Sequence, residues 1–229
     1  MSAIASNLQA VRARIAKAAL DAGRLPHEIT LLAVSKTWSV DCVIAAHQSG
    51  QRAFGENYVQ EAVDKARATA NLDLEWHFIG PLQSNKTRPV AEHFAWVHTI
   101  DRLKVAERLS AQRPSTLPPL QVCVQVNVSG EASKSGCTPD DAAALCSAVN
   151  ALPHLKLRGL MTIPEPADDF AAQRAPLRRL RELFATIRSS GLPLDTLSMG
   201  MSHDLEAAVA EGATIVRIGT AIFGERSYA

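Results

Sequence analysis

The sequence lacks metal-binding motifs and a charge excess of either sign. Its four cysteines, Cys42, Cys123, Cys137 and Cys146, form no CxxC pair, and its seven histidines form no HExxH or other paired-ligand motif. We therefore expect no metal site, and we interpret the cysteines as reduced thiols of an intracellular protein. The formal net charge is +1, from 24 basic and 23 acidic residues. This balance argues against a broad nucleic-acid-binding surface.

Long apolar runs are also missing. No run reaches the roughly 18 residues that span a bilayer, and residues 1–23 form an amphipathic pattern that ends at Gly23 rather than a signal peptide. We expect this segment to be a helix packed on the body of a cytoplasmic protein without membrane contact. Because no Gly/Ser linker interrupts the chain, one domain over 1–229 is the economical interpretation.

Short apolar runs alternate with helical patterns along the whole chain. The runs predict strands at 30–35, 52–54, 75–79, 95–99, 120–127, 155–161, 194–198 and 214–218. Helices are expected at 39–49, 57–69, 84–93, 101–112, 139–150, 169–190 and 203–211. This alternation predicts an α/β fold, a (β/α)8 TIM barrel in one domain, with a doubly wound open sheet as the alternative.

A lone lysine follows the first predicted strand. Alternation places Leu32, Val34 and Lys36 on one face, so the ammonium group continues a row of core side chains. Partial burial lowers the pKa of a lysine and makes its amine a nucleophile able to form a Schiff base with a carbonyl. A lysine that extends to water, or forms a structural ion pair, is the alternative.

Small polar residues follow the last two predicted strands. Ser198 ends the seventh strand, and Ser202 is a candidate N-cap for the helix at 203–211. Gly219 and Thr220 follow the eighth strand. In TIM barrels, the loops after these two strands commonly bind phosphate through free backbone N–H groups, so we expect a phosphate site here.

An arginine lies within the last predicted strand. Arg217 shares a face with Ile215 and Gly219, which directs its guanidinium into the barrel. A buried guanidinium needs an acceptor, either a core carboxylate or a ring nitrogen of a cofactor. A reactive lysine, a phosphate site and an arginine facing a ring together indicate pyridoxal 5′-phosphate (PLP).

At this point the sequence resembles the pyridoxal phosphate homeostasis proteins, a family of PLP-binding proteins. The matching segments run in order from residue 31 to residue 224 and are "LLAVSKT", "FGENYVQEA", "WHFIGPLQSNK", "SKSGC", "LRGLMTI" and "LSMGMSHDLEAAVAEGATIVRIGTAIFG". The resemblance implies a fold-type III barrel like the N-terminal domain of alanine racemase. It also implies a role in intracellular vitamin B6 homeostasis, with PLP held as a Schiff base on Lys36.

The resemblance also assigns the other cofactor contacts. Ser202, Gly219 and Thr220 match phosphate-binding positions, and Arg217 matches the arginine beside the pyridine nitrogen. The remaining expected cofactor-binding residues are Asn57, His77, Met161 and Ser198.

Two further positions stand out. Lys134 matches a lysine near the mouth of the site, a candidate acceptor of cofactor during transfer. The family usually continues SKT with a short residue and proline, whereas Trp38 and Ser39 follow here, so access to the site is in question.

Function is expected to be carriage rather than catalysis. An arginine at the pyridine nitrogen weakens the ring as an electron sink, and the only tyrosines are Tyr58 and Tyr228, so the second base of a racemase is hard to supply. We expect a monomer without catalytic residues that binds PLP, with apo PLP-dependent enzymes as candidate recipients. An amino-acid racemase is the alternative, and a Schiff-base aldolase without PLP is third.

The arginine-rich segment 174–188 is expected to be an ordinary helix surface. Arg174, Arg178, Arg181 and Arg188 recur at mostly helical spacing, opposite apolar residues. Such a pattern is typical of a solvated helix face, and an anion-binding patch is the alternative.

Overall fold

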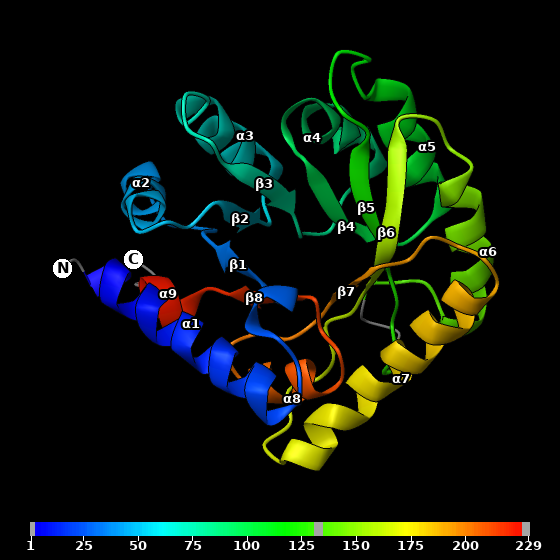
Figure 1. Ribbon diagram of the computed structural model, residues 1–229. Coiled ribbons are helices and arrows are strands. Elements are labelled where there is room, and N and C mark those ends of the chain that lie inside the picture. The colour runs from blue at the N-terminus through cyan, green and yellow to red at the C-terminus, as the bar shows by residue number, and fades with distance from the viewer. Residues whose placement is uncertain (1–2, 131–134, 226–229) are drawn as a thin grey trace.

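The computed structural model describes residues 3–130 and 135–225. Within these residues, eight parallel strands pair in chain order, and the last pairs with the first to close a barrel (Figure 1). The strands are β1 Thr30–Val34, β2 Ala53–Glu56, β3 Glu75–Phe78, β4 Trp96–Ile100, β5 Leu120–Gln125, β6 Leu155–Met161, β7 Thr196–Ser198 and β8 Ile215–Ile218. The predicted TIM barrel is confirmed, and the open-sheet alternative is wrong.

Helices cover the outside of the barrel between successive strands (Figure 1). The α-helices are α1 Ala3–Asp21, α2 Val40–Gln48, α3 Val59–Ala68, α4 Thr87–His93, α5 Leu103–Gln112, α6 Pro139–Asn150, α7 Phe170–Ser189, α8 Leu205–Ala210 and α9 Thr220–Phe223. Two 3₁₀ turns, Pro26–Glu28 and Ser84–Lys86, precede β1 and α4.

The boundaries differ from the sequence prediction by one to three residues at the starts and the ends of several elements. β1 ends at Val34, one residue early, and α8 begins at Leu205 rather than 203. Ser202 is therefore not the N-cap: Asp204 occupies that position, and its carboxylate accepts a hydrogen bond from the Met201 N–H at 2.7 Å. The short loop after β7 is thus fixed by its own side chains before the helix starts.

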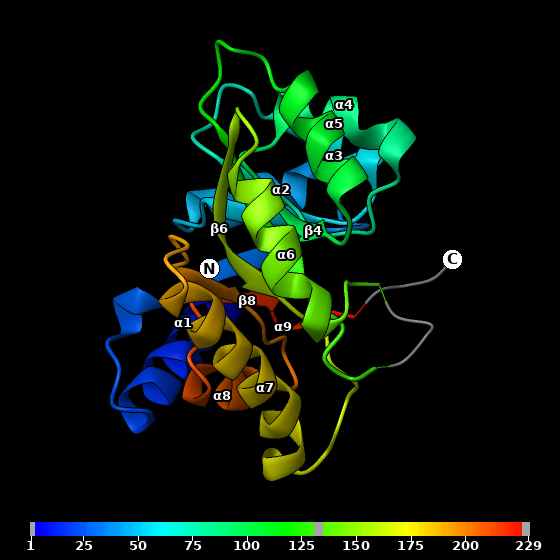
Figure 2. The same ribbon diagram turned by 90° about the vertical axis from the view of Figure 1, so that its right-hand side faces the viewer.

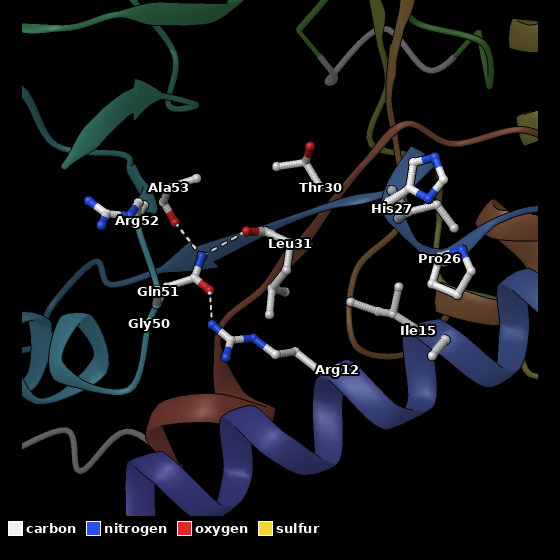
Figure 3. Close-up of a pocket in the computed structure, with 12 residues that line it drawn as sticks. Arg12, Ile15, Pro26, His27, Thr30, Leu31, Gly50, Gln51, Arg52 and Ala53 are labelled. Carbon is white, nitrogen blue, oxygen red and sulfur yellow. Dashed lines mark hydrogen bonds between the residues drawn. The ribbon is translucent and has the colours of Figure 1, made fainter. Parts of the chain in front are cut away.

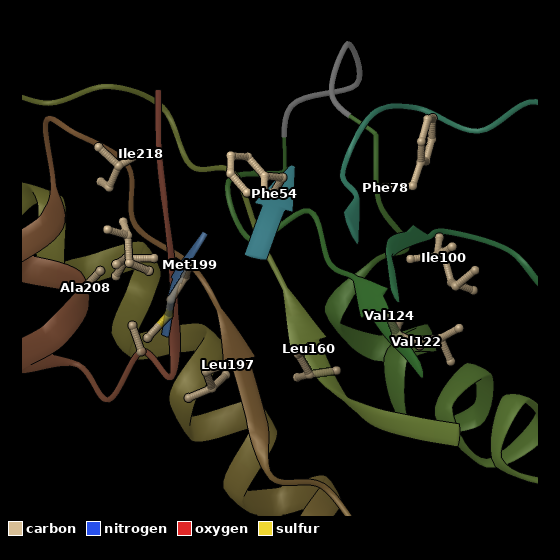
Figure 4. Close-up of a cluster of buried hydrophobic side chains, with 14 of the residues drawn as sticks. Phe54, Phe78, Ile100, Val122, Val124, Leu160, Leu197, Met199, Ala208 and Ile218 are labelled. Carbon is tan, nitrogen blue, oxygen red and sulfur yellow. The ribbon is translucent and has the colours of Figure 1, made fainter. Parts of the chain in front are cut away.

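Two apolar layers hold the barrel together. The outer layer packs strands against helices, and Figure 4 shows side chains of this layer such as Phe54, Leu160 and Ile218. The inner layer fills the barrel itself and comprises Leu32, Val34, Ala53, Ile79, Trp96, Cys123, Met161 and Ile215. Alternate residues of each strand supply the two layers, as the period of a strand requires.

The helix predicted over 1–23 packs on the barrel. Leu8, Val11 and Ile15 of α1 are buried, and α1 contacts α2, α8 and α9. Figure 2 shows α1, α7 and α8 gathered on one side of the molecule. Arg14 of α1 donates to the carbonyl of Ser202 at 2.8 Å and to both carboxylate oxygens of Glu206. The first helix therefore supports the loop after β7.

The arginines of α7 do not form a purely solvated face. Arg174 and Arg178 bond Glu211 Oε1 at 2.6 and 3.2 Å, and Arg181 Nη1 lies 2.7 Å from Oε2. The Oε2 contact lacks hydrogen-bond geometry, so it is an electrostatic contact. Glu211 is 0% exposed, directly after α8. The predicted solvated face is incomplete at these three residues: their side chains stay partly exposed, but their charges converge on a carboxylate distant in sequence.

Among the described residues, no helix combines the length and the apolar character needed to cross a bilayer.

Replacing Glu211 tests this ion-pair cluster. We expect Glu211→Gln to lower the free energy of unfolding by about 1–3 kcal/mol, below the usual cost of breaking a buried pair because the arginines are partly hydrated. Arg178→Ala should cost less than about 1 kcal/mol, since two arginines still neutralise the carboxylate. Urea denaturation measures both values. Equal losses in the two variants would contradict the central role of the buried carboxylate.

Candidate functional site

A cavity of about 250 Å³ opens at the carboxyl ends of the barrel strands. It brings together six of the nine residues predicted from the sequence to contact the cofactor. The lining residues are Val34, Lys36, Asn57, Ile79, Ile163, Met201, Ser202, His203, Arg217, Gly219 and Thr220.

Barrel closure places the lysine beside the arginine. β1 pairs with β8 in a register that aligns Leu32 with Arg217, so the residues that follow Val34 lie next to the end of β8. Lys36 is half-buried in the turn just past β1. Both cationic side chains line the same cavity. Together they favour a ligand with negative charge and an electrophilic carbonyl.

Arg217 is held by neutral acceptors rather than by the core carboxylate considered from the sequence. Its side chain is buried, with Nη1 donating to Ser198 Oγ and Nη2 to the Thr162 carbonyl, both at 2.8 Å. Among residues that the structure describes, it makes no ion pair. Burial lowers the pKa of Arg217 to about 10, and it stays protonated at neutral pH. Two of its five N–H groups are engaged, which leaves donors for a ligand.

The loops after β7 and β8 form the second half of the cavity. Ser202 comes from the first loop, and Gly219 and Thr220 come from the second, where Gly219 caps α9. The first N–H groups of a helical turn have no acceptor within the helix. A Cβ atom at Gly219 would lie 3.2 Å from the Val34 carbonyl oxygen, a tight contact that a glycine avoids. The three residues predicted to bind phosphate therefore line the same cavity as Lys36 and Arg217.

Asn57 also lines the cavity, from the segment between β2 and α3. Its position depends on Gly80, because a Cβ atom there would lie 2.0 Å from the Asn57 carbonyl oxygen. Asn57 Oδ1 is buried without a hydrogen-bond partner among the described residues. A polar atom in this state is available to a ligand.

His77, Ser198 and Met161 lie beneath the cavity rather than in its lining. His77 and Ser198 belong to a chain of hydrogen bonds across the barrel interior, and Met161 belongs to the inner apolar layer. The chain links Glu75 Oε1 to His77 Nε2 at 2.8 Å, His77 Nδ1 to His98 Nε2 at 2.9 Å, and His98 Nδ1 to Ser198 Oγ at 2.8 Å.

The two ends of this chain fix its proton positions. Arg217 can only donate to Ser198, and an ionised Glu75 can only accept from His77. With both rings neutral, Ser198 then donates to His98 Nδ1, and each histidine carries its proton on Nε2. Burial lowers the pKa of His98 well below its usual value, and burial also lowers the pKa of His77, against the opposing effect of Glu75. Both pKa shifts therefore favour the neutral form of the two histidine rings.

The remaining predicted positions fall outside the cavity lining. Trp38 stacks on Phe223 with ring centroids 5.9 Å apart, so it joins the lysine turn to α9. Tyr58 is 57% exposed and lines a neighbouring groove. Lys134 and Tyr228 lie outside the described residues.

Several residues of the site were missed by sequence reasoning. Ile79, Ile163, Met201 and His203 line the cavity, and His98 joins the buried chain. The role of His98 could have been predicted from the sequence, because a histidine inside an apolar strand needs a buried hydrogen-bond partner. The apolar lining residues carried none.

A larger cavity, about 490 Å³, lies at the opposite end of the barrel (Figure 3). Two of its polar side chains are already paired: Gln51 Nε2 donates to the carbonyls of Leu31 and Ala53, and Arg12 donates to Gln51 Oε1 and to the Ser49 carbonyl. These bonds join the starts of β1 and β2 to α1, so this region is structural.

The buried histidines predict a dependence of stability on pH. Because the pKa of His98 is lower in the folded protein than its ordinary 6.5, the unfolded chain binds more protons once the pH falls below about 6.5. The free energy of unfolding should then decrease by up to about 1.4 kcal/mol per pH unit for each such histidine. Glu75 has a lowered pKa, so its contribution is lost only below 4.5, in a separate window.

The effect is measured as the free energy of unfolding of His98→Asn between pH 5 and 7. This range spans the ordinary histidine pKa of about 6.5. The variant should have a shallower slope than the unsubstituted protein. His154→Asn, at an exposed loop position, is the control and should keep the original slope. Identical slopes in all three proteins would contradict a neutral, buried His98.

The chain is similar to known proteins in sequence and in fold. Residues 1–227 match the family model described as alanine racemase, N-terminal domain. A pyridoxal phosphate homeostasis protein from Pseudomonas aeruginosa is 64% identical over 228 residues, which cover 100% of this chain and 98% of the relative.

Two solved structures are similar in fold. PipY of Synechococcus elongatus, solved with PLP bound, is 38% identical, with a TM-score of 0.84 over 96% of this chain and 100% of PipY. An alanine racemase from Corynebacterium glutamicum, 19% identical with a TM-score of 0.72, is matched over 98% of this chain but 61% of its own, and it shows the fold alone. The resemblance seen in the sequence is confirmed: the chain belongs to the alanine racemase N-terminal domain family, among the pyridoxal phosphate homeostasis proteins.

Proposed function

We propose that this protein binds PLP and takes part in intracellular PLP homeostasis, with the cofactor attached reversibly to Lys36. One observation carries the proposal: Lys36, Arg217 and the loop residues Ser202, Gly219 and Thr220 line one cavity at the carboxyl ends of the strands. The names of the P. aeruginosa relative and of PipY with PLP bound support the same ligand.

Each residue has a task that follows from its position. Ser202, Gly219 and Thr220 would bind the phosphate group, and Arg217 would donate to the ring nitrogen. Lys36 would hold the cofactor through its amine: PLP would supply an aldehyde to which this amine could attach, with loss of water. Asn57, with its unpartnered Oδ1, would orient a polar substituent of the ring.

The chain of hydrogen bonds below Arg217 would act indirectly. His77 and Ser198 are predicted from the sequence as cofactor contacts, and they are proposed here as supports for Arg217. Ser198 accepts from Arg217 and holds His98, so it fixes the direction of the guanidinium. Met161 would support the cavity from beneath its lining, as part of the inner apolar layer.

Carriage is proposed in preference to catalysis. A permanently charged arginine at the ring nitrogen donates a hydrogen bond without giving up its proton, so the ring stays a weak electron sink. Tyr58, a candidate second base of a racemase, does not line the cavity. We further propose a cytoplasmic monomer with apo PLP-dependent enzymes as recipients. PLP transfer to an apo-enzyme in the presence of a free-PLP trap tests direct delivery.

Replacing the lysine tests the attachment site. We expect the purified protein to form a PLP adduct that borohydride fixes on Lys36, whereas Lys36→Ala should form at most about a tenth as much. Lys17→Ala, at an exposed residue paired with Asp21 on α1, is the control and should retain the full adduct. Peptide mass spectrometry locates the adduct. A Lys36→Ala protein that retains the adduct at a different lysine would refute the assignment.

Obstructing the second loop tests phosphate binding. Thr220→Leu should weaken PLP binding by about tenfold or more, because it replaces a hydrogen-bonding group with a bulky apolar one. Thr220 is exposed, so the melting temperature should change little. Binding is measured by fluorescence titration with PLP and with pyridoxal, which lacks the phosphate. The variant should lose its preference for PLP over pyridoxal; an unchanged preference would contradict a phosphate site at Thr220.

A further inference from the structure

The turn that carries Lys36 is held from outside the barrel. Lys65 of α3 is buried, with 5% of its side chain exposed, and its Nζ donates to three acceptors: the Ser35 carbonyl at 2.7 Å, Glu56 Oε1 at 2.8 Å and Glu61 Oε1 at 2.6 Å. We call Lys65, Glu56 and Glu61 the Lys65 cluster. An ammonium group has three donors, so all of its hydrogen bonds are made within this group of contacts.

The Lys65 cluster forms hydrogen bonds with both neighbours of Lys36 in the chain. On one side, Ser35 is fixed through its carbonyl by Lys65 and through its hydroxyl, which donates to Glu56 Oε1 at 2.7 Å. On the other side, the Thr37 N–H donates to Glu61 Oε1 at 2.5 Å. The backbone before and after Lys36 is therefore bound to one set of charged side chains, whereas the Lys36 side chain lines the cavity.

Thr37 has a backbone conformation that is unfavourable for its residue type. Its φ is +70°, in the left-handed region that a β-branched residue strongly disfavours. The turn is closed by a hydrogen bond from the Trp38 N–H to the Ser35 carbonyl at 3.0 Å, and glycine is the usual residue where such turns need a positive φ. Strain of this kind persists only where the surroundings enforce it, and the bond from Thr37 to Glu61 is the enforcing contact.

Glu56 and Lys65 belong to the layer between the strands and the helices. Glu56 ends β2 with a 0% exposed side chain, and one of its oxygens, Oε2, is buried without a hydrogen-bond partner among the described residues. Burying two charges costs more than an apolar pair would, so their presence needs a reason beyond stability. Fixing the turn that presents Lys36 is such a reason.

We propose that Lys65, together with Glu56 and Glu61, is a positioning device that holds the Lys36 turn in the geometry required for cofactor attachment. This inference rests on the proposed attachment of PLP to Lys36. Lys65 itself is not the attachment site: its amine is buried and fully engaged, and it does not line the cavity. The cluster determines how fast and how tightly Lys36 binds the cofactor, although none of its three residues lines the cavity.

The test measures the rate of PLP attachment by stopped-flow absorbance, with the borohydride adduct mapped in each variant. Glu61→Ala should slow attachment by about ten- to a hundredfold, the usual range for a misplaced reactive group. Glu61 is 28% exposed, so this variant keeps its fold. Gln60→Ala, on the same helix at an exposed residue that donates to Asp64, is the matched control and should react at the original rate.

A second substitution separates positioning from general loss of structure. Thr37→Gly removes the cost of the positive φ, so Glu61→Ala/Thr37→Gly should recover most of the lost rate. Lys65→Met/Glu56→Gln removes both buried charges together, should melt close to the original temperature and should also attach PLP slowly.

Each outcome has a distinct meaning. If the unsubstituted protein forms no adduct at Lys36, the proposed function fails. If it does so and both Glu61→Ala and Lys65→Met/Glu56→Gln react at its rate, the positioning role is refuted. An adduct on Lys65 would also refute it, and a double variant with Thr37→Gly that stays as slow as Glu61→Ala would show that strain at Thr37 is not what the cluster controls.

Discussion

The pairing of β1 with β8 is the constraint on which the site depends. It joins the beginning of the sheet to its end and aligns Leu32 with Arg217. Because the strands are parallel, all their carboxyl ends face the same side, and Lys36 and Arg217, 181 positions apart, share one cavity. Lys36 would otherwise be a half-buried lysine in a turn, and Arg217 a buried charge held only by neutral acceptors.

Near this junction, the two cationic residues Arg217 and Lys36 are held in place by different contacts. Arg217 is held from inside the barrel, where Ser198 and two neutral histidines extend to Glu75. Lys36 is held from outside the barrel, through the backbone of its turn. Trp38 links the two sides, because it stacks on Phe223 of the short helix that begins after Gly219. The residues that support the two cations lie outside the cavity lining, whereas Lys36 and Arg217 line the cavity.

Periodicity was enough to predict the barrel, because each strand of a parallel sheet is apolar and each connection is amphipathic. Alternation also predicted correctly that Arg217 faces the interior with Ile215. It failed where contacts between distant residues decide the structure. The spacing of Arg174, Arg178 and Arg181 indicated a solvated face, and nothing local revealed that Glu211 would be buried beneath them. Likewise, "SKT" marked the lysine but not Lys65, whose partners come from three separate segments.

The most direct test of the account is a crystal structure of the protein grown with PLP. Continuous electron density should join Lys36 Nζ to the cofactor, with the phosphate at Gly219 and Thr220 and the ring nitrogen within hydrogen-bond distance of Arg217. Cofactor density attached to a different lysine, or a ring turned so that Arg217 faces no nitrogen, would contradict the account.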